Sequence, residues 1–149
     1  YRFDEPWNSE ANLMVMEQMP GVFRDPAATG DKYHTTYFAL TGKDTMFPDG
    51  EAMSFEKVTD GNSQTILLVE AKREIPWTKP EDIPYDREAR LPELGGHHEA
   101  VFIAALVDGS VQLIHQSIHE PTLRSLITPA GGEVPGGEGI FVPGPVPRR

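Results

Sequence analysis

The chain has 149 residues, about the length of one domain, and 38% of them are hydrophobic, which is enough to form a core. Its 23 acidic and 13 basic residues give a net charge of −10, which repels nucleic-acid phosphates and anionic lipid surfaces, so neither is expected as a partner. The absence of cysteine excludes disulfides, thiolate catalysis and sulfur-based zinc sites, and no apolar run approaches the roughly 20 residues of a transmembrane helix.

The N-terminal part of the chain predicts a short helix over residues 9–18. Asn8 or Ser9 can cap its first turn, and a proline followed by a glycine ends it. Leu13 and Met16 recur at helical spacing. We therefore expect this helix to place both side chains on the core.

Three strands are expected in the middle of the chain. Residues 33–40 alternate and are rich in threonine and aromatic residues, residues 55–58 predict a brief strand, and residues 64–71 form the clearest strand. The apolar run in the last of these is nearly continuous, which predicts burial on both faces. Residues 72–97 contain many prolines and charges, and we expect them to form an irregular loop packed on the sheet.

The next segment predicts an antiparallel hairpin over residues 101–114. Two apolar runs flank Asp108-Gly109, a dipeptide typical of a two-residue type I′ turn, in which both central residues have positive φ. A short helix is then expected over residues 121–127, with Glu120 as its N-cap and Pro121 at its first position.

These elements predict an α+β fold with a small antiparallel sheet, short flanking helices and long ordered loops. We expect one globular domain over residues 1–128. Residues 129–149 are rich in proline and glycine and predict an extended or disordered tail, with Ile140, Phe141 and Val142 as its one apolar cluster.

Several segments occur in the order found in a known protein family. His98 is followed by nine residues and then by Asp108-Gly109. The other matching segments are Asp4-Glu5-Pro6-Trp7-Asn8 with Asn12, Met19-Pro20 before Val22-Phe23-Arg24, Thr59-Asp60-Gly61-Asn62-Ser63-Gln64-Thr65-Ile66 before Val69-Glu70, Pro76-Trp77-Thr78-Lys79-Pro80-Glu81-Asp82, and Leu123-Arg124-Ser125-Leu126-Ile127-Thr128 with Gly131-Gly132-Glu133. Together they resemble the prepilin-type H-x9-DG family of planctomycete bacteria, which is described as of unknown function.

The resemblance implies a pilin-like or pseudopilin-like globular portion located in the cell envelope or outside the cell. It also implies that the chain corresponds to the carboxy-terminal part of a larger protein, whose preceding part would supply any membrane anchor. The chain departs from the family at two places. Asp25-Pro26 stands where Cys-Pro is often found, so thiol chemistry is absent, and Gln64 stands where asparagine is expected.

Four histidines are candidates for a metal site, since imidazole nitrogen binds zinc, copper, iron and nickel. They are His97, His98, His115 and His119, and the last two have a spacing of four residues without an HExxH pattern. The favoured role of His98 is structural: a hydrogen bond to backbone or to a carboxylate at the base of the hairpin. Asp108 and Gly109 are explained by the turn.

Two acidic loops are candidates for calcium, which prefers oxygen ligands. Their residues are Asp44, Asp49 and Glu51 in the first loop, and Asp60 and Asn62 in the second. Neither loop follows the EF-hand pattern, although secreted pseudopilins of related architecture can hold calcium in a loop. A turn at Asp60-Gly61 is the simpler interpretation.

Trp7, Trp77 and Tyr85 can form an aromatic platform for a sugar or peptide, but a tryptophan beside a proline more often pins a loop to the core. The chain contains no GxSxG motif, and we expect no enzymatic activity and no cofactor apart from possible calcium.

The favoured interpretation is a noncatalytic envelope or extracellular protein that acts through protein contacts in a pilus-like or secretion assembly. A binding module for calcium, a sugar or another solute is the main alternative. A metal-dependent enzyme that uses His97, His98 and Asp108 is a weaker one.

Overall fold

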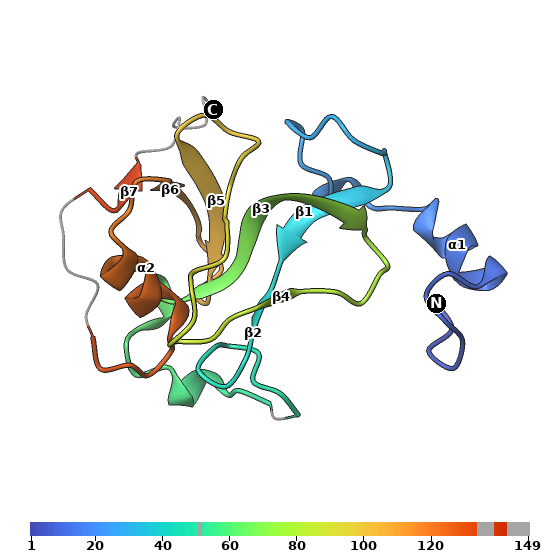
Figure 1. The fold of residues 1–149 in the computed structure, drawn as a ribbon. Coiled ribbons are helices and arrows are strands. Elements are labelled where there is room, and N and C mark those ends of the chain that lie inside the picture. Colours follow the sequence, from blue (N-terminus) through green and yellow to red (C-terminus); the bar gives the residue numbers. More distant parts are fainter. Residues whose placement is uncertain (51, 134–138, 143–149) are drawn as a thin grey trace.

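The computed structural model describes residues 1–50, 52–133 and 139–142. Its main layer is a five-stranded antiparallel sheet in the order β1-β3-β5-β6-β7 (Figure 1). The strands are β1 His34–Phe38, β3 Ile66–Pro76, β5 Val101–Leu106, β6 Val111–His115 and β7 Phe141–Val142. A second, parallel sheet pairs β2 Leu40–Thr41 with β4 Ile83–Pro84.

Two α-helices accompany the sheets, α1 Glu10–Met16 and α2 Glu120–Ile127, together with the 3-10 turns η1 Gly21–Phe23, η2 Phe55–Lys57 and η3 Asn62–Gln64. This mixture confirms the predicted α+β fold class. No helix in the described residues combines the length and apolar character needed to cross a bilayer.

The core lies between α2 and the sheet. Along β5 the buried side chains alternate, so that Phe102, Ala104 and Leu106 share one face. Leu126 and Ile127 of α2 belong to the same buried cluster. The period-two pattern of β5 and the apolar side of α2 therefore meet, and each covers the surface that the other would expose to water.

The predicted hairpin is confirmed, with Val101 opposite His115 and Ala105 opposite Val111. Its turn is not the predicted type I′ turn. The N–H of Gly109 donates to the carbonyl of Leu106 at 2.9 Å, and Gly109 has φ of 84°, whereas Asp108 is outside the positive-φ region. This is a longer loop that ends in a left-handed glycine. The Ser110 hydroxyl and N–H both donate to Asp108, which lowers the pKa of that carboxyl.

Replacing Gly109 with valine should lower the free energy of unfolding by about 1–2 kcal/mol, because a left-handed backbone is costly for a side chain that branches at Cβ. A Cβ at this position has open space around it, so backbone strain is the cause. Gly21→Val is the matched control, since its site is equally open and its φ is ordinary. Urea denaturation of both variants checks this, and equal losses would contradict it.

The first helix is capped as predicted by Ser9, whose hydroxyl accepts the N–H of Asn12 at 3.3 Å. The expectation that Leu13 and Met16 face the core is wrong: Leu13 is exposed and Met16 is only half-buried. The buried residue is Asn12. Its side-chain amide binds the N–H and carbonyl of Arg2 and the carbonyl of Pro6, so this helix is held by polar contacts to the preceding chain.

Three predictions for the middle strands need correction. The strand expected over residues 33–40 is interrupted at Ala39, whose N–H donates to the Asp82 carboxylate at 2.9 Å. Residues 55–57 form a 3-10 turn instead of a strand. The strand expected over residues 64–71 begins two residues later, and it is not buried on both faces, because Leu68 is exposed.

The prediction of irregular structure throughout residues 72–97 is wrong for two parts. The strand β3 continues to Pro76, and β4 adds a short parallel pairing to β2. Elsewhere the segment packs on the core as expected at Tyr85, which is buried, and at Leu91 and Leu94, which are partly buried, whereas residues 86–90 are exposed.

The C-terminal helix begins one residue earlier than predicted, so that His119, and not Glu120, is its N-cap. In the predicted tail, β7 pairs with β6 at Leu113 and Ile114. Asp60 holds residues 129–133 of the tail. Its carboxylate accepts the N–H groups of Gly131 at 2.7 Å and Gly132 at 3.1 Å. Residues 134–138 and 143–149 lie outside the described residues.

Candidate functional site

The sheet opens between β3 and β5, and the segment before β5 enters this opening. The pairing of the two strands reaches Val69 opposite Ala104. At the next residue of β3, the Glu70 carbonyl accepts the N–H of Gly95 at 2.8 Å, and Ala71 forms a bridge to Gly95. The segment 95–98 therefore takes the place of β5 beside β3.

Two glycines allow this close approach. A Cβ on Gly95 would lie 2.8 Å from the Cβ of Phe102, and one on Gly96 would overlap the side chain of Lys72. Both also have positive φ. The Gly95-Gly96 pair is thus required for the chain to pass between the strands.

The Glu70 side chain fills the opening and is fully buried. One carboxylate oxygen accepts the N–H of His97 at 3.2 Å, and the other accepts the N–H of Ile103 at 3.0 Å. The carboxylate therefore replaces the backbone acceptors that a continuous ladder would supply.

Asp25 approaches Glu70 from the loop after η1 and is also fully buried. Its Oδ1 accepts the N–H of Ala27 at 2.8 Å, and its Oδ2 accepts the hydroxyl of Thr36, in β1, at 3.3 Å. These two bonds fix the orientation of the carboxylate.

His98 completes the cluster. Its Nε2 lies 3.6 Å from Asp25 Oδ1, and one third of its side chain is exposed. A carboxylate lies beside His98, but the contact is too long to be the hydrogen bond expected from the sequence, so the structural role of His98 stays a prediction. The Nε2 atom is buried and has no hydrogen-bond partner among the described residues. Ligand atoms of Asp25, Glu70 and His98 all lie within 4.8 Å of one another.

Both carboxyl groups of the cluster are held by hydrogen bonds. All four carboxylate oxygens of Asp25 and Glu70 act as acceptors. The pKa of Tyr37 is raised by burial and then by the negative charges of these two residues. Within the described residues His98 is the ion-pair partner of Asp25, and Glu70 has none.

A surface hollow of about 400 Å³ borders the cluster. Its lining includes Ala27 and His97, the two residues whose N–H groups hold Asp25 and Glu70. The rest of its lining is Thr29, Lys72, Arg73, Glu74 and Gly96. Asp25, Glu70 and His98 themselves do not line this hollow.

The other predicted histidine ligands do not join this cluster. The Nε2 atom of His97 is buried but does not belong to the cluster, and it has no hydrogen-bond partner among the described residues. Asp108 lies at the hairpin tip, at the opposite end of β5 from His98. His115 and His119 are both exposed. The combination of His97, His98 and Asp108 is therefore not assembled.

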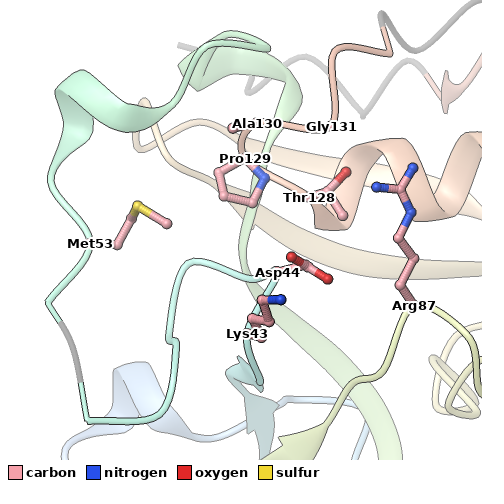
Figure 2. Close-up of a pocket in the computed structure, with 8 residues that line it drawn as sticks. All are labelled: Lys43, Asp44, Met53, Arg87, Thr128, Pro129, Ala130 and Gly131. Carbon is pink, nitrogen blue, oxygen red and sulfur yellow. The ribbon is translucent and has the colours of Figure 1, made fainter.

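Two of the predicted calcium ligands, Asp44 and Asp49, line one surface hollow of about 430 Å³, which Lys43 and Arg87 also line. Asp44 also borders a smaller pocket of about 110 Å³, whose lining residues are drawn in Figure 2. Asp49 is exposed, and Glu51 lies outside the described residues.

In the second acidic loop, both carboxylate oxygens of Asp60 are engaged by the glycines after α2. The Asn62 carbonyl accepts the N–H of Asp108 at 3.0 Å, and the Asn62 side chain is exposed. Asp60 therefore joins two parts of the chain, as a structural turn residue does.

The three aromatic candidates do not form one exposed platform. Tyr85 is buried in the core, where the Arg124 guanidinium lies 5.9 Å from its ring centroid. Trp77 stacks on Phe23, and its indole N–H donates to the Met16 carbonyl at 2.9 Å, which pins α1 to the end of β3. Trp7 is half-buried beneath the Lys79 ammonium group.

Sequence reasoning missed Asp25 and Glu70. The available signal for Glu70 is an acidic residue directly after the apolar run of residues 66–69. For Asp25 the signal is its place where the H-x9-DG family, which the sequence resembles, often has cysteine. Each signal is weak by itself, because the partners are separated by tens of residues and meet only in the fold.

A second feature is an exposed apolar surface at the N-terminal end of the molecule. We call it the α1 surface; it comprises Tyr1, Phe3, Leu13, Met14, Val22 and Phe23, all exposed. The Phe23–Trp77 stack and the Asn12–Arg2 bonds hold its parts beside α1. In Figure 1, α1 and the N-terminus project beyond β1 and β3.

No protein-family model matches this chain, and neither a curated protein nor a solved structure is similar enough to count as a match. The resemblance to the H-x9-DG family consequently rests on the residues quoted above. The cluster contains residues from two segments that match this family, Glu70 and His98. Its third residue, Asp25, stands at a position where the chain departs from the family.

Proposed function

We propose that this chain is a noncatalytic envelope or extracellular domain whose α1 surface binds a second copy of the chain in a pilus-like or secretion assembly. The supporting observation is the concentration of large apolar side chains on that surface. Phe3 is 92% exposed and Val22 is 77% exposed, so neither side chain belongs to the core.

Scattered exposed apolar residues are ordinary on a protein surface, but several of them in segments that contact one another favour an interaction site. Six of the ten large hydrophobic residues that are exposed in the described part of the chain belong to the α1 surface. Covering them in an interface removes apolar area from water, which stabilises association. The net charge of −10 opposes close approach of two copies, so association should strengthen with salt.

The resemblance to prepilin-type proteins supports a second copy as the occupant, because pilus-like assemblies repeat one kind of subunit. Contacts of this kind are heterologous and join one surface of a subunit to a different surface of the next. They also require no chemistry at the interface, in agreement with a noncatalytic role.

Sedimentation velocity over a wide concentration range tests the proposal. The wild type should shift from monomer to larger species as its concentration rises. The double variant Phe3→Glu, Val22→Glu should remain monomeric at concentrations at least tenfold higher, because two charges would have to be buried in the interface.

The matched control is Phe55→Glu, Val111→Glu, which changes the same residue types at exposed positions, 65% and 66%, away from the α1 surface. It carries the same added charge and should associate as the wild type does. A wild type that stays monomeric throughout, or equal effects of the two double variants, would refute the proposal.

The two alternatives have less support. A sugar or solute site around Trp77 competes with the stacking of its ring on Phe23. An enzyme that uses His97, His98 and Asp108 requires groups at opposite ends of β5 to act together.

A further inference from the structure

We propose that Asp25, Glu70 and His98 bind one divalent transition-metal cation, with zinc as the best-fitting ion. Two carboxylate oxygens and one imidazole nitrogen converge from three segments of the chain. The site is independent of the α1 surface, so either proposal can fail without the other.

The first argument is the burial of the ligands. Asp25 and Glu70 are fully buried and lie in one cluster, and two buried carboxylates are costly unless a cation compensates them. A divalent cation bound by both carboxylates and the imidazole would supply that compensation.

The second argument is the distance between the ligand atoms. Zinc ligands at about 2.1 Å in a tetrahedral arrangement lie about 3.4 Å apart. The 3.6 Å between His98 Nε2 and Asp25 Oδ1 is close to this separation, and it is too long for a hydrogen bond. The same nitrogen is buried and lacks a hydrogen-bond partner among the described residues, so its lone pair is available to a metal.

The surroundings of the ligands fit a metal site as well. Backbone N–H groups of Ala27, His97 and Ile103 and the Thr36 hydroxyl hold the carboxylates in place. Such outer bonds orient metal ligands and leave a second lone pair on each oxygen. One third of the His98 side chain is exposed, so an ion and a water molecule as fourth ligand would reach the site on the side of this residue.

The ligand types decide between ions. Calcium and magnesium prefer sites made entirely of oxygen, whereas an imidazole with carboxylates suits zinc and neighbouring first-row ions. Zinc should therefore bind, and calcium should not compete with it at similar concentrations.

The full chain, without a histidine tag and stripped of metal with EDTA, is titrated with zinc and, as a spectroscopic probe, with cobalt(II). Elemental analysis after desalting should find one zinc per chain, and the melting temperature should rise until one equivalent has been added. Asp25→Asn, Glu70→Gln and His98→Ala should each weaken binding at least tenfold. His119→Ala and Glu56→Gln, both at exposed positions, are the matched controls and should bind as the wild type does.

One variant tests directly whether residue 25 is a metal ligand. Asp25→Cys exchanges an oxygen ligand for a thiolate, so its cobalt(II) form should gain a sulfur-to-metal charge-transfer band that the wild type lacks. This arm does not depend on whether Asp25→Asn folds. A folded Asp25→Cys protein that binds cobalt without the band would overturn the assignment.

The wild type itself gives the remaining decisive outcomes. No stoichiometric zinc and no change in melting temperature would reduce the cluster to an ion pair between His98 and Asp25, and the proposal would be abandoned. Loss of binding in His119→Ala, with retention in His98→Ala, would assign the metal to exposed histidines and reject the site.

Discussion

Replacing Phe102 with alanine is expected to lower the free energy of unfolding by about 3–5 kcal/mol. The ring is 2% exposed and lies in the main core cluster between the sheet and α2. The change removes buried apolar surface and leaves a cavity that well-packed neighbours fill only in part. Urea denaturation followed by circular dichroism measures the loss.

Phe55→Ala is the matched control for this change. Its ring is 65% exposed, and a substitution at such a position should alter the free energy of unfolding by less than about 0.5 kcal/mol. Similar losses for the two variants would mean that the core is not centred on β5 and α2.

Replacing Glu70 with alanine is expected to cost about 3–5 kcal/mol, measured in the presence of EDTA so that no cation contributes. The change leaves the N–H groups of His97 and Ile103 buried without acceptors, each at about 1–3 kcal/mol, and opens a cavity. Glu70→Gln should cost less, because the amide oxygen still accepts one of these bonds.

Glu56→Ala serves as the control, because Glu56 is an exposed acidic residue in η2. Its effect should be close to zero. If Glu70→Ala proved equally harmless, the carboxylate would not be the group that holds β3 and β5 together at their opening.

The elements predicted well from the sequence are those with local causes. The hairpin depends on two apolar runs and a glycine placed between them, and α2 on a proline at its start and apolar residues at helical spacing. Residues within about ten positions of one another determine both. Their periodicity is therefore visible without knowledge of the fold.

The errors arose where distant residues decide the local structure. The break at Ala39 depends on Asp82, 43 positions away. The error at Leu13 has a different cause, because Arg2 and Pro6, to which Asn12 bonds, are only ten and six positions away and these polar bonds leave no trace in the apolar spacing. No hydrophobic pattern contains this information, because the hydrogen bonds belong to the tertiary structure.

The candidate site shows the same division. His98 was singled out by its spacing to Asp108, yet a strand of six residues keeps the two apart, and its actual neighbour is Asp25. Glu70 was hidden within the apolar strand because an inward-facing acid is invisible unless the chain beside it is known. The insertion of residues 95–98 gives that carboxylate one partner, the N–H of His97, and β5 gives it the other, the N–H of Ile103.

The order in which the chain folds follows from where these segments lie. The β5–β6 hairpin joins neighbours in sequence and closes on a microsecond scale, whereas the cluster needs positions 25, 70 and 98 to meet. Contacts over such separations bear a larger loop-closure entropy, so we expect them to form after the hairpin has provided a template for β3. Asp60 and Gly131, 71 positions apart, join over a similar separation. We therefore expect the two carboxyl groups to lose their hydration only after most of the sheet exists, so that they are not buried in a half-formed state.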